Sequence, residues 1–226
     1  MSNKEAPAPD RPQRPNRRIE QGLQSRARLV AEARRLFERD GYAKTSTEGL
    51  LAATGLTRGA LYHHFRDKRD LFVAVCDAVH ADLAEAIDAA ADGIADPARQ
   101  LVAGALAWIA AVAQPGPRQV LLIDAPAVLG AAEWQALDDS HGFAQLRQAV
   151  LALLQPQGAA ATQRAEALAA ALNGALNALV HWRAQHDGRS AEAALQEVVE
   201  RLFATLLKQP PAATATMKRP ARPRTP

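Results

Sequence analysis

The feature that most constrains this chain is a pair of short helical patterns that meet at Gly55, within residues 45–72. Thr57 stands directly before the second pattern, where its hydroxyl can accept a hydrogen bond from a free N–H of the first helical turn. Apolar side chains at helical spacing would pack the two helices together. These side chains are Leu50, Ala53, Leu56 and Leu61. The stretch therefore predicts a helix-turn-helix unit.

A longer helical pattern precedes this unit and ends near Asp40. Its apolar positions recur at helical spacing, at Leu29, Ala33, Leu36 and Phe37. Gly41 follows and supplies a plausible C-terminal stop. We expect this helix to support the helix-turn-helix unit from behind.

Residues 25–75 resemble the DNA-binding domain of the TetR family of transcriptional regulators. Glycines, aromatic residues, the capping residue and a lysine occur in the family's order. The matching positions are Gly41, Tyr42, Thr45, Ser46, Gly55, Leu56, Thr57, Leu61, Tyr62, His63, His64, Phe65, Lys68, Leu71 and Phe72. The resemblance implies an all-α protein of about nine helices, with a three-helix DNA-binding domain followed by a helical ligand-binding and dimerisation domain.

DNA-contacting residues are implied by this resemblance and by their chemistry. Arg58 is the best candidate to read guanine, because a guanidinium can bond both O6 and N7 in the major groove. Gly59 would let the backbone approach DNA, and Lys68 would hold a phosphate together with the N-terminus of its helix. Asp67 would cap that helix. The full set predicted to contact DNA is Thr45, Ser46, Thr47, Thr57, Arg58, Gly59, Ala60, Tyr62, His63, His64 and Lys68.

Two positions depart from the family pattern. Thr47 stands where a branched aliphatic residue is usual, and Gly49 stands where a polar or acidic residue is usual. Glycine inside a helix costs about 1 kcal/mol relative to alanine. We therefore expect a slightly soft supporting helix.

Composition excludes several classes of protein. Of the residues, 48% are hydrophobic and strand-type alternation is almost absent, which favours an all-α fold. No apolar run approaches a membrane span and the N-terminus lacks a signal-peptide core, so we expect a cytoplasmic protein without a membrane partner.

Cys76 is the only cysteine; it is either a buried apolar residue or a redox sensor. His63 and His64 diverge on a helix, so we expect neither a metal nor a cofactor.

Charge is concentrated at the two ends of the chain. Residues 1–70 carry 15 Lys and Arg against 9 Asp and Glu, whereas residues 71–208 carry 8 against 15. A basic N-terminal part attracts phosphate without selecting a sequence. Residues 1–20 are predicted to be a disordered arm, or one whose arginines enter the minor groove. Residues 209–226 are predicted to be a disordered basic tail.

Between these ends, we expect a helix-turn-helix domain at residues 21–72 and a ligand-binding and dimerisation domain at 73–208. A long helix from Asp67 to about Ala91 would link them. A second helix follows Asp96, residues 120–130 form a short helix broken near Pro126, and one helix spans about 131–154.

By the resemblance, the helices of residues 97–154 enclose an effector pocket. The few aromatic residues there suit a small molecule that is largely apolar or aromatic. Asn177 and His181 interrupt the apolar pattern of residues 162–186 and face either the pocket or a subunit interface, as do Asn173 and Trp182. The predicted ligand contacts are Trp108, Leu122, Asp124, Val128, Trp134, Leu137, His141, Phe143, Asn177 and His181.

The last two helical patterns cover about 162–186 and 191–207, and Ser190 is predicted to cap the second. They suit a four-helix bundle made by two subunits, as the family implies, although one stripe could also pack within the chain. The sequence thus predicts a homodimeric repressor that binds a palindromic double-stranded DNA operator and is released by its ligand, with no enzyme activity. The alternative is a helical interaction or small-molecule-binding protein without specific DNA binding.

Overall fold

The computed structural model describes residues 15–207 of the 226-residue chain. These residues form eleven α-helices and one π-helical segment, η1, with no strand among them. The prediction of an all-α fold is confirmed. The elements are α1 (Pro15–Asp40), α2 (Thr47–Thr54), α3 (Arg58–His64), α4 (Lys68–Ala91), α5 (Pro97–Val112), α6 (Pro115–Arg118), η1 (Gln119–Asp124), α7 (Ala125–Leu129), α8 (Ala131–Ser140), α9 (Gly142–Leu154), α10 (Ala159–Arg183) and α11 (Arg189–Leu206).

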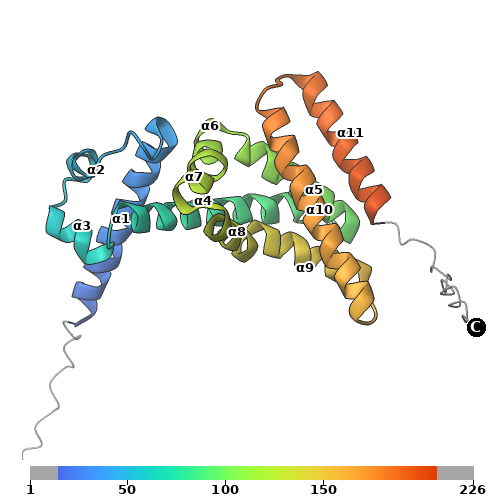
Figure 1. Cartoon of the computed structure of the whole chain (residues 1–226), viewed down its shortest axis with the longest axis horizontal. Helices are drawn as coiled ribbons and strands as arrows, with labels where there is room; N and C mark the ends of the chain where they lie inside the picture. Colours follow the sequence, from blue (N-terminus) through green and yellow to red (C-terminus); the bar gives the residue numbers. More distant parts are fainter. Residues whose placement is uncertain (1–14, 208–226) are drawn as a thin grey trace, which may run out of the picture.

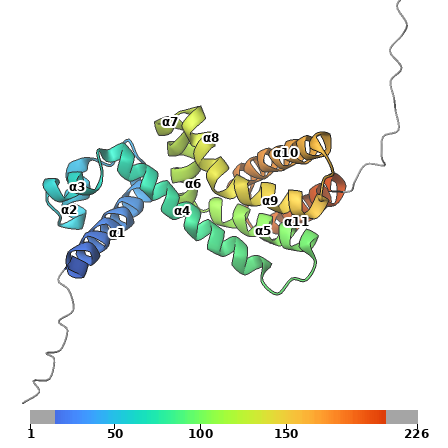
Figure 2. The same cartoon turned by 90° about the horizontal axis from the view of Figure 1, so that it is seen from below.

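The molecule is long, and α4 runs along its middle (Figure 1). Helices α1, α2 and α3 lie at one end, and α10 and α11 lie at the other. Figure 2 shows α5 and α9 beside the second half of α4 and close to α10. Since α4 belongs to both ends, its direction determines where α2 and α3 sit relative to the remaining helices.

The helix-turn-helix unit forms as its local signals predict. Ser46 caps α2 by accepting from the backbone N–H of Gly49, and Thr57 caps α3 by accepting from that of Ala60. Gly55 has φ +66°, a left-handed conformation that glycine adopts without a steric penalty. The turn between the two helices is therefore set by a glycine and two hydroxyl caps.

The core beneath this unit is aromatic. Phe37 and Phe72 are fully buried with their ring centroids 5.3 Å apart, and the ring of Tyr42 lies 4.9 Å from that of Phe72. Leu50 and Leu61 are buried as predicted, but the prediction for Ala53 is wrong because it is exposed. The neighbouring Thr54 is buried instead, and its hydroxyl donates to the carbonyl of Leu50, which satisfies the buried polar group.

The linking helix and its caps agree with the prediction. Asp67 caps α4 by accepting from the backbone N–H of Asp70 at 2.7 Å, and Asp96 caps α5 by accepting from that of Ala98. Cys76 is fully buried in α4, and burial raises the pKa of its thiol to about 12. A thiol held protonated in the core is a packing residue, which decides against the redox alternative.

Three boundary predictions are wrong. Residues 15–20, expected in a disordered arm, belong to α1, because Pro15 suits a first helical turn, where its missing N–H is not needed. The helix expected over 131–154 is interrupted at His141, whose φ of −123° and ψ of −106° are not helical. Gly188, and not Ser190, precedes α11 as its cap residue.

The stretch 120–130 forms two short elements instead of one helix. Gln119–Asp124 is π-helical, and α7 follows with Pro126 in its first turn, close to the predicted break. This division, the interruption at His141 and the short α6 together explain why more helical elements occur within residues 15–207 than the nine expected. The predicted arm at residues 1–14 and the tail beyond residue 207 lie outside the described residues. None of the helices within residues 15–207 is long and apolar enough to cross a membrane.

Candidate nucleic-acid interface and internal cavity

Helix α3 presents one side to solvent. Arg58, Gly59 and His63 are exposed, and 48% of the surface of Tyr62 is accessible although tyrosine is a large, partly apolar residue. Leu61 and Phe65 hold the opposite side of the helix in the core. An exposed aromatic ring beside an arginine on a capped helix is a surface suited to the edges and phosphates of nucleic acid.

Arg58 pairs with the supporting helix in this structure. One of its guanidinium nitrogens donates to Glu48 Oε1 at 2.7 Å, and both side chains are well exposed. Exposed ion pairs of this kind contribute little to stability, so the arginine can exchange Glu48 for another acceptor. Glu48 therefore holds Arg58 near the tip of α3 without burying it.

Thr45 and Lys68 make hydrogen bonds within the chain. Thr45 is buried, and its hydroxyl donates to the carbonyl of Gly41 at 2.9 Å. Lys68 Nζ donates to the carbonyl oxygens of Tyr42 and Thr45 at 2.8 and 2.9 Å and lies 3.9 Å from the centroid of the Tyr42 ring. Burial lowers the pKa of Lys68. In this structure both residues fix the loop before α2, and their predicted contacts with DNA stay predictions.

The remaining predicted residues lie around the start of α2 and the exposed part of α3. Ser46 and Thr57 use their hydroxyls as caps, whereas Thr47, Ala60 and His64 are only partly exposed. Gly49 is explained by the cap, since an added Cβ would lie 3.3 Å from the hydroxyl of Ser46. A glycine at this position therefore avoids a close contact with the capping hydroxyl of Ser46.

A contact between α1 and η1 joins the helix-turn-helix end to the rest of the molecule. Asp124 Oδ2 accepts from the backbone N–H of Tyr42 at 2.7 Å, and Asp124 Oδ1 accepts from Gln119 Nε2 at 3.1 Å. Tyr42 in turn accepts from Lys68 through its carbonyl. Asp124 thus connects the π-helical segment to the lysine that positions α2.

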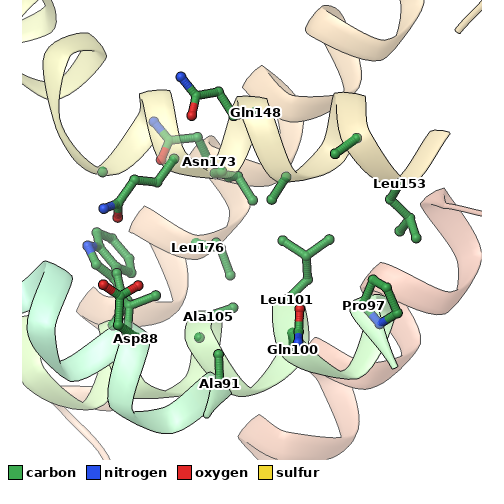
Figure 3. A pocket seen from close by; sticks show the side chains of 18 of the residues that line it. Asp88, Ala91, Pro97, Gln100, Leu101, Ala105, Gln148, Leu153, Asn173 and Leu176 are labelled. Atoms are coloured by element: carbon green, nitrogen blue, oxygen red, sulfur yellow. The ribbon is translucent and has the colours of Figure 1, made fainter. Parts of the chain in front are cut away.

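A cavity of about 660 Å³ lies between α4, α5, α9 and α10. In Figure 3, Gln148 and Leu153 face Asp88, Ala91 and Pro97 across it. Leu101 and Ala105 project from α5, and Leu176 projects from α10. The wall is mainly apolar with a few amide and carboxylate groups, as in small-molecule sites.

Only Trp108 of the ten predicted ligand residues lines this cavity. Asp124 lies at the α1–η1 contact, and the Trp134 indole N–H donates to the carbonyl of Leu121 at 3.1 Å. His141 bonds Asp77 at 3.0 Å and stacks on His80, which places it outside the wall. The other predictions that the cavity does not include are Leu122, Val128, Leu137, Phe143, Asn177 and His181.

Several lining residues were missed. One face of α9 lines the cavity at a helical repeat that was visible in the sequence: Gly142, Gln145, Leu146, Ala149, Ala152 and Leu153. Asn173 was correctly singled out beside Asn177 and lies on the wall. The sequence did not indicate that Asp88 lines the cavity, because it did not show which face of the long α4 turns toward α9.

A metal-binding cluster is absent from the described residues. Within residues 15–207, no group of three or more His, Cys, Asp or Glu side chains is arranged to hold a metal ion. His63 and His64 are neighbours with ring centroids 5.1 Å apart. The exposed side of α3 and the cavity are therefore the two candidate functional surfaces of the described residues.

Both parts of the chain match known families of bacterial regulators. Residues 29–75 match the model described as bacterial regulatory proteins, tetR family, and residues 98–207 match the tetracyclin repressor-like C-terminal domain. A solved TetR-family transcriptional regulator from Pectobacterium atrosepticum is 30% identical, with a TM-score of 0.65 over 85% of this chain and 98% of that one. The chain belongs to the TetR family. The family resemblance inferred from the helix-turn-helix residues is thus confirmed.

Curated relatives match only part of this chain. The HTH-type transcriptional repressor AcnR of Corynebacterium glutamicum is 41% identical over 63 residues, which are 28% of this chain and 34% of AcnR. The repressor Rv1474c of Mycobacterium tuberculosis is 46% identical over 57 residues, 25% of this chain and 30% of that protein. The matched segments thus span about a third of each relative's length.

Proposed function

We propose that this TetR-family chain is a transcriptional repressor that binds a palindromic operator as a homodimer and releases it when a small molecule occupies the cavity. The observation that carries the proposal is the exposed side of α3, with Arg58, Gly59 and Tyr62 presented outward by a helix whose other side is buried. In helix-turn-helix proteins this part of the second helix enters the major groove. Similarity to repressors over the same residues supports it.

The roles at the DNA surface differ from residue to residue. We propose that Arg58 reads a guanine, that Tyr62 and His63 contact phosphates or thymine methyl groups, and that Ser46, Thr47 and Thr57 border the phosphates. Lys68 acts as a positioning residue, because it holds the carbonyl of Thr45 directly before the cap of α2. The DNA-binding domain comprises residues 21–72, and residues 73–208 bind the ligand and the second subunit.

The outer face of α10 supports the proposed dimer. Its exposed positions recur at helical spacing and carry small side chains, so a second helix can approach closely: Ala167, Ala170, Ala171, Gly174 and Ala178. On α11, Val198 is 48% exposed although it is apolar. Pairing α10 and α11 with their symmetry mates forms a four-helix bundle and places two copies of α3 on one operator.

Ligand binding and DNA binding are linked by α4 in this proposal. Asp88 and Ala91 of α4 line the cavity, while the other end of α4 begins at Lys68 beside the helix-turn-helix unit. A ligand that favours a different tilt of α4 would move the two recognition helices away from successive major grooves. Releasing DNA a hundredfold needs about 2.7 kcal/mol of coupling.

The test is selection of bound sequences from a pool of random DNA duplexes by the purified chain, at two salt concentrations. We expect a palindrome whose half-sites lie about one helical turn apart, enriched at both salt concentrations. Binding that depends on salt and enriches no motif would overturn the proposal and favour the alternative of a ligand-binding or interaction protein without specific DNA binding.

A further inference from the structure

The cavity wall carries charge of one sign. Among its 20 lining residues are two carboxylates, Asp88 and Asp138, and no lysine, arginine or histidine. Asp88 is exposed and lies at the edge, whereas Asp138 is largely covered. Two negative charges facing one space attract a cation and repel an anion.

Nearby basic side chains bond or lie close to other acidic residues. His141, which follows α8, bonds Asp77 at 3.0 Å, and Arg147 of α9 lies 3.7 Å from Glu166 of α10. The C-terminal turns of α4 and α9 border the cavity with Ala91 and Leu153, and this end of a helix carries partial negative charge. The N-terminus of α5 also lies there, but the carboxylate of Asp96 caps it.

Asp138 has acceptor capacity left for a ligand. It accepts from Asn173 Nδ2 at 2.9 Å, its one side-chain hydrogen bond within residues 15–207. An ionised carboxylate has about four acceptor positions, so most of its capacity is unused. Burial raises the pKa of Asp138, which means that the surroundings do not compensate its charge fully.

The rest of the wall suits an apolar body. Trp108, Leu101 and Leu146 contribute aromatic and aliphatic surface. Gly142 approaches the indole closely, since an added Cβ would lie 3.7 Å from Trp108 Nε1. Amides of Gln145 and Gln148 make no hydrogen bond within the described part of the chain and supply neutral polar groups at the exposed side. Such a wall buries an alkyl or aryl group without adding charge.

We propose that this cavity binds a monovalent organic cation, an amine with an alkyl or aryl body, whose charged nitrogen pairs with Asp138 while Asp88 at the edge attracts it. This inference rests on the proposed function, in which the cavity is the effector site. It narrows the expected class of largely apolar or aromatic ligands to those that carry one positive charge.

The test uses three probes of the same shape: phenylhexylamine, phenylhexanol and phenylhexanoate. Calorimetric titration of the full chain without DNA, near pH 7, measures each affinity. We expect the amine to bind most tightly and the carboxylate most weakly, with at least about tenfold between them. Equal affinities, or tighter binding of the alcohol or the carboxylate, would overturn the proposal.

Three variants locate the charge. Asp138→Asn and Asp88→Asn should reduce the preference for the amine over the alcohol, with the larger loss, about tenfold, for Asp138→Asn. Asp139→Asn is the matched control, because it removes the same charge one residue further along α8 at an exposed position. A preference that persists in both variants would contradict the assignment. If Asp138→Asn does not fold, two other measurements decide the test. They are the preference of the wild type for the amine and the effect of Asp88→Asn on that preference.

The calorimetric titration and the DNA selection test the two proposals independently. The selection needs no ligand and the titration needs no DNA. A sequence motif without any preference for the amine would leave the repressor proposal and reject the cation. An amine preference without a motif would reject the repressor proposal and keep a cation-binding cavity.

Discussion

The helix-turn-helix end and the cavity end of this molecule are built in opposite ways. Around α1–α3 the interior is filled, with Phe37, Tyr42 and Phe72 in mutual ring contact and a lysine bonded to two loop carbonyls. Between α4, α5, α9 and α10 the helices leave about 660 Å³ unfilled, bordered partly by exposed amides. The first region can present α3 as a rigid unit, whereas the second can change shape at a smaller cost in packing.

Loss of the buried aromatic core should have the largest effect. Phe72→Ala removes a fully buried ring that contacts both Phe37 and Tyr42, so we expect the free energy of unfolding to fall by about 4 kcal/mol. Urea denaturation at fixed protein concentration measures this. Tyr62→Ala removes an exposed ring and should change stability by less than about 0.5 kcal/mol while weakening DNA binding. Equal stability losses would mean that the first region is not the rigid one.

Lowering the pH should reduce the free energy of unfolding through His80, which lies on α4 between the two regions. Burial, assisted by His141, lowers the pKa of His80 from 6.5 to about 4. Between these values the unfolded chain binds a proton that the folded chain does not, so stability is full above pH 6.5 and falls as pH drops toward 4. The expected loss is about 3 kcal/mol.

Unfolding of His80→Gln across this pH range isolates the effect. The variant should lose less stability on acidification than the wild type does. His63→Gln, which removes an exposed histidine of α3, should follow the wild-type curve. Parallel curves for the wild type and His80→Gln would show that another group causes the acid sensitivity.

Lys68 tests whether the start of α2 is held by the lysine. Lys68→Met removes its bonds to the carbonyls of Tyr42 and Thr45 and should cost about 2 kcal/mol of stability. Lys44→Met removes an exposed charge close by and should affect salt-dependent DNA attraction alone. Unchanged stability in Lys68→Met would return the lysine to the phosphate-binding role expected from the family.

Asp124 tests the connection between the regions and should give the smallest change in stability. Asp124→Asn leaves one acceptor oxygen where two accept from Tyr42 and Gln119, so we expect a loss of about 1 kcal/mol. DNA affinity should fall only slightly, but its response to a cavity ligand should shrink. Anisotropy of a labelled operator, with Asp139→Asn for comparison, measures both. An unchanged ligand response would remove Asp124 from the coupling.

The same contrast explains what the sequence could predict. Ser46, Gly55, Thr57 and Asp67 act through neighbours three or four residues away, so their caps and turn were predicted correctly. The hydrogen bonds of Thr45 and Lys68 to carbonyls of the loop after α1 were not predicted, because a hydroxyl or an ammonium can bond many acceptors and its residue type selects none of them. The position of a residue in a family motif does not show which acceptor its side chain bonds in the folded chain.

The cavity was harder to predict because it is a tertiary feature. Its wall combines faces of four helices, and the interruption at His141 rotates α9 relative to α8. That break turned Gly142 toward the cavity and placed His141 and Phe143 outside the wall. The apolar repeat of α9 was present in the sequence, but a repeat shows that a face is buried without showing whether it faces a core or a space.

The most direct test of the central claim is the affinity of wild type and Arg58→Ala for the selected operator and for its single base-pair variants. The account predicts that Arg58→Ala binds the operator about 5- to 150-fold more weakly, and that it no longer distinguishes one symmetric base pair in each half-site. Arg99→Ala, which removes an exposed arginine of α5, should bind as the wild type does. If Arg58→Ala keeps the wild-type affinity and base preferences, α3 does not read the operator and the account is wrong.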